Sequence, residues 1–101
     1  MKTFDLHTMA AAPYEERDSN VFYQSPEFKA RIIELPAGGS MPDCEMESYV
    51  VFTAIEGEAT VKVNGEKTGL QAGQCLITEP ATLSMETGNG VKILGLQIAV
   101  H

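Results

Sequence analysis

The chain of 101 residues has no tryptophan, only two histidines and few basic residues. Seven Lys and Arg stand against fourteen Asp and Glu, which gives a formal net charge of −7. This balance repels phosphate backbones and anionic bilayers, so neither nucleic acid nor a membrane is expected as a partner. No apolar run is long enough to span a membrane. The residues after Lys2 also contain no apolar segment of the kind found in a secretory signal peptide. We expect a cytoplasmic protein.

Cysteine is also scarce, because Cys44 and Cys75 are the only two. Two thiols do not make the disulfide framework of a small secreted domain, so both are expected to be reduced. A chain of this length buries enough surface for one core without a covalent staple. We therefore expect a single domain over residues 1–101.

Short stretches rich in β-branched and aromatic residues recur between glycines and prolines, and no helical pattern of ten residues competes with them. Asn64 and Gly65, flanked by alternating residues, give a strong hairpin signal. Residues 1–25 lack a sustained period and are expected to form an arm or edge beside a barrel over residues 28–100. The strands expected are 28–35, 49–55, 59–63, 75–78, 83–86 and 91–100, which favour an antiparallel sandwich or barrel.

Two glycine-bounded segments carry a further pattern. One runs from Gly38 to Gly57 and the other from Gly73 to Asn89, with Pro80 inside it. Their spacing resembles the cupin motifs GxxxxxHxHxxxExxxxxxG and GxxxxxPxGxxHxxxN, although the second has one extra residue before the proline. The phrases IEGEATVKVNGE and LQAGQCLITEPATL are also cupin-like. The resemblance implies a small, RmlC-like, single-domain cupin, an all-β double-stranded β-helix of the jelly-roll type.

In cupins the two His, the Glu and the later His of these motifs usually bind one Fe, Mn, Ni, Zn or Cu ion. Here those positions hold Cys44, Met46, Val50 and Met85. Valine has no donor atom, and thioether sulfur is a soft, weak ligand for a divalent ion. The resemblance therefore implies a cupin without the usual metal site. No cofactor is predicted, and metal-dependent activity is not transferred to this chain.

Strand alternation would place Cys44, Met46 and Val50 on one side and the carboxylates of residues 43, 45 and 47 on the other. If the resemblance fixes the first set inward, the carboxylates form a solvated rim. Phe52 continues the inward set. We expect a ligand pocket lined by sulfur atoms and hydrocarbon groups, which suits a small, largely apolar molecule. The residues expected to line it are Cys44, Met46, Val50, Phe52 and Met85.

Two alternatives stay open, and whether the chain is an enzyme is left undecided. Cys44, Met46 and Met85 would together make a soft site for Cu(I), or Cys44 would serve a thiol-dependent reaction. The chain would otherwise be a metal-free isomerase or lyase that uses a tyrosine, one of residues 14, 23 and 49, as acid or base.

Residues 49–55 are apolar on both faces, because Tyr49, Val51 and Ile55 alternate with the inward set. A second apolar face has to be covered by something. Either residues 1–25 or another copy of the chain would cover this face. We expect a homodimer.

Overall fold

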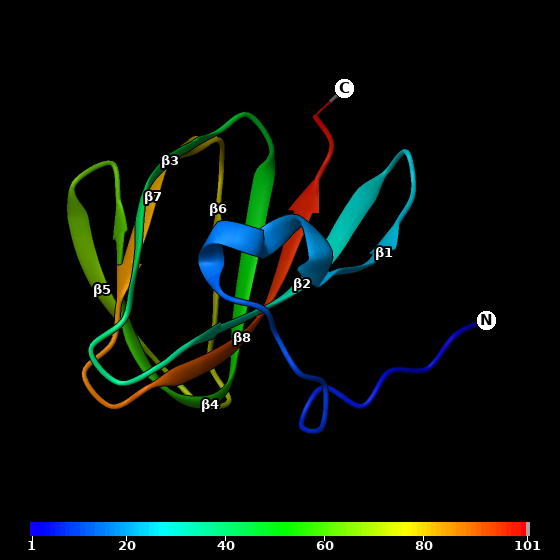
Figure 1. Cartoon of the computed structure of the whole chain (residues 1–101). Helices are drawn as coiled ribbons and strands as arrows, with labels where there is room; N and C mark the ends of the chain where they lie inside the picture. The colour runs from blue at the N-terminus through cyan, green and yellow to red at the C-terminus, as the bar shows by residue number, and fades with distance from the viewer. Residues whose placement is uncertain (101) are drawn as a thin grey trace.

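The computed structural model describes residues 1–100, and almost all of its regular structure is antiparallel strand (Figure 1). One short 3-10 helix precedes eight strands. In chain order these are η1 (Tyr14–Asn20), β1 (Val21–Gln24), β2 (Phe28–Leu35), β3 (Ser40–Met46), β4 (Tyr49–Val63), β5 (Glu66–Gln71), β6 (Cys75–Thr78), β7 (Ala81–Glu86) and β8 (Val91–Ile98). No helix among these residues is long and apolar enough to cross a membrane.

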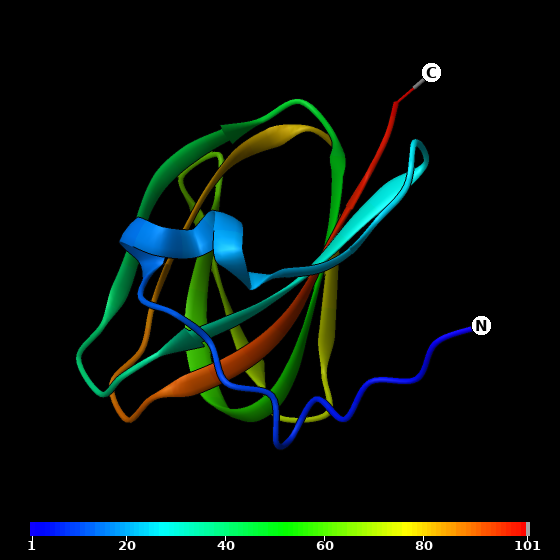
Figure 2. The ribbon, with the colours of Figure 1, turned by 45° about the vertical axis from the view of Figure 1, so that its right-hand side comes forward.

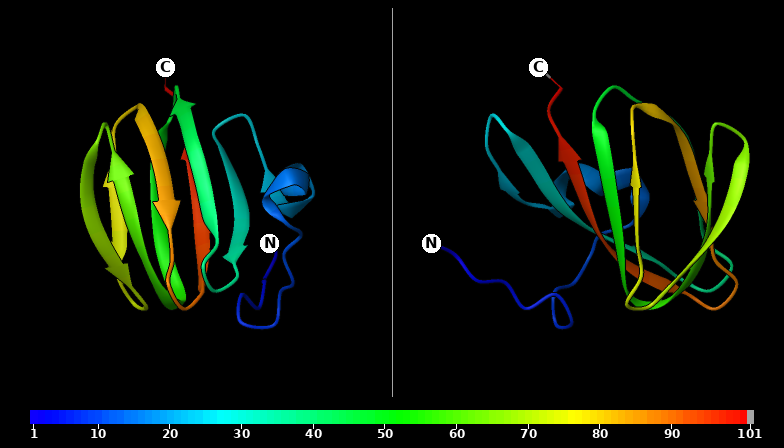
Figure 3. Two further views of the ribbon diagram at one scale, coloured as in Figure 1. Left: turned by 60° about the vertical axis from the view of Figure 1, so that its left-hand side comes forward. Right: turned by 180° about the vertical axis from the view of Figure 1, so that it is seen from behind.

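The strands curl into a barrel around β4. The sheet order is β1-β2-β8-β4-β7-β3, and β5 and β6 also pair with β4. The first half of β4 pairs with β8 and β6, whereas its second half pairs with β5 and β7. Figures 2 and 3 show the two halves facing each other across the interior. The predicted all-β, jelly-roll class is confirmed.

Two predicted strands have the predicted bounds, namely 28–35 and 75–78, and a tight turn joins β4 to β5. Asn64 and Gly65 both have positive φ there, 49° and 86°, as a two-residue hairpin turn requires. The predicted strands 49–55 and 59–63 are one continuous strand with a bulge between Ala54 and Glu56. Helix η1 was not predicted, because residues 14–20 carry no period that marks it, whereas β1 lies at the edge of the sheet, one of the two places expected for residues 1–25.

The bend in β4 depends on Gly57. Its φ is +80°, a conformation that side chains other than glycine rarely adopt. A Cβ atom built on Gly57 would overlap the backbone oxygen of Gly90 in the turn before β8. The strand therefore turns from one half of the barrel to the other at a position where only glycine fits.

We expect Gly57→Ala to lower the free energy of unfolding by about 2 kcal/mol or more, because both the backbone conformation and the contact with Gly90 oppose a methyl group. The control is Gly69→Ala on β5, where nothing lies within 4 Å of an added Cβ and φ is not positive. Urea denaturation of both variants checks this. Equal stability of the two variants would show that the bend does not need glycine.

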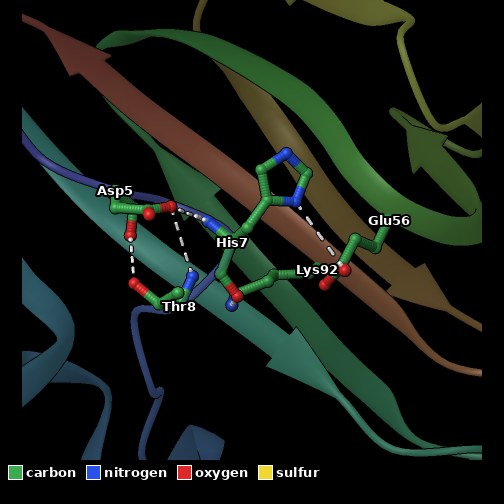
Figure 4. A network of polar contacts seen from close by, with 5 residues as sticks. All are labelled: Asp5, His7, Thr8, Glu56 and Lys92. Atoms are coloured by element: carbon green, nitrogen blue, oxygen red, sulfur yellow. Dashed lines mark hydrogen bonds and ion pairs between the residues drawn. The ribbon is translucent and has the colours of Figure 1, made fainter.

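The N-terminal arm lies on the outside of the barrel and is tied down by polar contacts (Figure 4). The buried Lys92 on β8 donates from Nζ to the carbonyl oxygen of His7 at 2.8 Å. The His7 ring lies 3.7 Å from Glu56 of β4, measured from Nδ1 to Oε1. Asp5 accepts from the backbone N–H of His7 at 3.0 Å. Because of these contacts, the arm covers part of the outer face of the sheet.

Candidate functional site

A cavity of about 150 Å³ lies inside the barrel, between the β2–β8–β4 wall and β3. Four of the five predicted pocket residues line it: Cys44, Met46, Val50 and Phe52. Helix η1 crosses the seam between β2 and β3, where the barrel is not closed by strand pairing (Figures 1 and 2). Its residues Tyr14, Arg17 and Asp18 complete the lining.

Met85 is the predicted pocket residue that does not line the cavity. It is 3% exposed and belongs to the packed core. In the strand register Met85 lies opposite Met41 of β3 and Val61 of β4, whereas Cys44 lies opposite Leu83. The prediction that Met85 lines the pocket does not fit this cavity, because β7 contributes Leu83 to its wall whereas Met85 packs in the core.

Two sulfur atoms meet at the cavity wall. Cys44 Sγ lies 3.5 Å from Met46 Sδ and is placed to donate to it. The side-chain amide of Gln97 on β8 approaches the same Met46 Sδ at 3.8 Å. Met41 also lines the cavity, although its role was not predicted. The wall thus carries one thiol and two thioethers.

The inward direction of Cys44 and Met46 follows from alternation along β3. Asp43 and Glu45 are exposed on its other side, and Glu47 is exposed in the bend that follows. The alternation predicted through residues 43–50 assumes one extended run, which is wrong in detail. The chain bends at 47–48 and passes from β3 to β4, and Val50 still faces inward after the bend.

Arg31 is the unexpected member of the site. It extends from β2 along the cavity and donates from Nη2 to Oε1 of Gln97 at 3.1 Å. Its Nε atom is buried and has no hydrogen-bond partner. Buried donors are nearly always paired, so this one requires an explanation. Sequence alternation gave no signal for Arg31, because the next two residues, Ile32 and Ile33, are both apolar and either face was eligible.

The free space depends on Gly95 in the wall formed by β8. A Cβ atom added there would lie 3.3 Å from Ile33 Cδ1 and 3.5 Å from Phe52 Cε1. A larger side chain at position 95 would therefore project from β8 into the cavity and fill it. Gly95 pairs directly with Phe52 and with Arg31, so the glycine leaves room between these two side chains.

The candidate acid–base tyrosines lie apart. Tyr14 lines the cavity and carries Arg17 over its ring, with Cζ 4.5 Å from the centroid. Tyr23 is stacked on Phe28 at 5.4 Å between ring centroids, and Tyr49 is exposed at the start of β4. Only Tyr14 is therefore placed to touch a molecule in the cavity.

Within residues 1–100, no group of three or more His, Cys, Asp or Glu side chains lies together as a metal site would need. The four positions that correspond to cupin ligands supply one thiol, two thioethers and a valine. These donors do not fit a hard divalent ion. Both cysteines are free thiols: Cys44 borders the cavity, whereas Cys75 is exposed on β6.

Two larger hollows lie outside the barrel. One, of about 610 Å³, runs between the arm and the turn before β8, and Lys92, its one cationic side chain, is already bonded to His7. The other, of about 430 Å³, lies between Phe4 of the arm and the outer face of β2 and β8. Neither coincides with the predicted site.

Solved structures share this architecture, whereas no protein-family profile and no curated protein matches the chain. The cupin domain of Cnp3 from Schizosaccharomyces pombe superposes with a TM-score of 0.71 at 20% identity, over 79% of this chain and 61% of that one. A cupin superfamily protein from Desulfitobacterium hafniense DCB-2 gives 0.74 at 16%, over 79% and 74%. This chain has the cupin fold.

A protein named as a dioxygenase is also among the matches. Salicylate 1,2-dioxygenase from Pseudaminobacter salicylatoxidans superposes with a TM-score of 0.68 at 22% identity. That match covers 72% of this chain but 21% of the dioxygenase. At such identities the likeness shows the fold alone. The cupin resemblance drawn from the two glycine-bounded segments is thereby confirmed, and function has to be argued from the site.

Proposed function

We propose that this cupin-fold chain binds a small, largely apolar molecule inside its barrel. The observation that carries the proposal is the cavity of about 150 Å³ among the β2, β3, β4 and β8 walls. Apolar side chains such as Ile33, Phe52 and Leu83 form most of its wall. Apolar cavities of about this size are known to take up molecules such as benzene. We also propose the cytoplasmic location expected from the composition. In that compartment the Cys44 thiol would stay reduced.

Toluene should bind in this cavity, and Gly95→Val should abolish the binding by filling the space between Arg31 and Phe52. Chemical-shift perturbation in NMR spectra measures this, with the largest shifts expected for Cys44 and Phe52. Cys44→Leu is a second filling variant, in case Gly95→Val does not fold. Shifts spread over the outer groove near Phe4 instead would contradict the proposed site.

A soft-metal site is the second candidate, favoured by the 3.5 Å contact between Cys44 and Met46. Met85 is not part of it, because it does not reach the cavity. Met41 lines the cavity and is the remaining candidate for a thioether ligand. A thiolate with two thioethers suits Cu(I).

Under anaerobic conditions we expect one Cu(I) per chain if this second candidate holds, measured in competition with a chromophoric Cu(I) chelator. Cys44→Ser should remove the binding because a hydroxyl is a poor ligand for a soft ion. Cys75→Ser is the matched control, since that thiol is exposed on β6. Equal loss in both variants would indicate thiol binding at the surface, and no uptake at all would eliminate this candidate.

We further propose that two copies pair through the outer face of β4, β6 and β8. This face carries exposed large hydrophobic residues, and the outward positions between them are uncharged. In a chain of net charge −7, an uncharged apolar face avoids like-charge repulsion between copies. The residues concerned are Tyr49, Val51, Thr53, Cys75, Ile77, Leu94, Leu96 and Ile98.

Ile77→Glu should convert the dimer to a monomer, because it puts a carboxylate of each copy into the shared apolar face. Ile77 is 70% exposed, so the fold of one chain tolerates the change. Light scattering at micromolar concentration measures the mass. Thr68→Glu, exposed on β5, adds the same charge elsewhere and should leave the dimer intact. A wild-type particle of 10.9 kDa would refute the proposal.

A further inference from the structure

We infer that the molecule bound in the barrel is a small monocarboxylate whose carboxylate is held by Arg31. This inference rests on the proposed function and adds to it the charge and chemical class of the ligand. It comes from a side chain that lies outside both cupin motifs.

Arg31 is a cation without an anionic partner. Among residues 1–100, the ion pair present is that of His7 with Glu56, outside the barrel. Arg31 instead uses Nη2 on the neutral amide oxygen of Gln97, and its Nε is left without a partner. Arg31 is half-buried with its Nε enclosed, and taking part of a charged group out of water without pairing it is unfavourable. Fourteen acidic residues were available in this chain, and none satisfies Arg31.

The neighbouring groups favour an anion as the missing partner. Gln97 fixes the guanidinium against the β8 wall, which leaves its other N–H groups to serve a planar, two-oxygen acceptor. Arg17 adds a second positive charge at the rim. Asp18 is the single acidic lining residue; it is exposed and forms no ion pair with Arg31 or Arg17 in the described chain.

The size and the walls of the cavity limit the rest of the ligand. About 150 Å³ accommodates one six-membered ring or a short branched chain, not a nucleotide or a fatty acid. Ile33, Phe52 and Leu83 provide apolar contact for such a body. The carboxylate would then lie toward Arg31 and the body toward the β3 and β7 side of the barrel.

Benzoate is the probe, compared by calorimetric titration with its neutral analogue benzamide and with toluene. We expect benzoate to bind at least about tenfold more tightly than benzamide, which is the scale of a charge-assisted hydrogen bond. Arg31→Met should remove that advantage and leave toluene binding unchanged. Lys67→Met, exposed on β5, makes the same change in net charge and should leave benzoate binding as in the wild type.

Thermal unfolding without ligand separates binding from a structural role. If Arg31 is an unpaired cation kept for a ligand, Arg31→Met leaves the midpoint unchanged or raises it, whereas a structural ion would lower it. If Arg31→Met does not fold, Arg31→Lys decides, because it keeps the charge and loses the planar fork. Benzoate affinity in Arg31→Lys should then fall several-fold below that of the wild type.

Two results would overturn the inference, and they differ in what else they overturn. Equal binding of benzoate and benzamide, or benzoate affinity unchanged by substitution of Arg31, refutes the anionic ligand and leaves the apolar cavity as proposed. Failure of both benzoate and toluene to bind refutes the cavity as a ligand site, and the proposed function falls with it.

Discussion

The shared strand β4 is the constraint on which the rest of the structure depends. Its 15 residues pair with four other strands, so both halves of the barrel are fixed to one piece of backbone. The bend at Gly57 sets how the halves face each other, and the backbone of Gly90 packs against it. Once that bend is set, alternation along β4 decides that Val50 and Phe52 point inward. The position of the cavity follows from this geometry.

The chemistry of the interior then depends on what the other strands contribute. The positions that in cupins carry imidazole and carboxylate hold sulfur and hydrocarbon here, which removes the donors for a hard ion. Two contributions from β8 and β2 lie outside the cupin motifs. Gly95 leaves space that a side chain would fill, and Arg31 brings a positive charge to that space. The cupin motifs alone therefore indicate a degenerate metal site and give no sign of Arg31 in the cavity wall.

The sequence predicted the fold and most of the residues of the cavity wall that lie within the cupin motifs. Asn64 and Gly65 mark a turn that few other residue pairs can form, and the spacing from Gly38 to Gly57 places Cys44 and Met46 on the inner face. Met85 was misplaced because motif spacing gives the strand but not how far along the wall the cavity extends. Arg31 was missed because the two isoleucines that follow it, Ile32 and Ile33, make both faces of β2 look buried. The helix η1 has no periodic signal at all.

Strand alternation also separates two surfaces of the molecule, the cavity wall inside the barrel and the apolar face outside it. On β8, Gly95 and Gln97 face the cavity, whereas Leu94 and Leu96 face outward with Ile98. The inner surface lacks an anion for Arg31, and the outer surface is covered in part by the arm, with Tyr49, Ile77 and Ile98 left exposed. Each side chain along the strand is committed to one face, so neither face can be completed by residues of the other. Ligand binding and self-association are therefore expected to vary independently, because substitutions on one face leave the other face of the same strand intact.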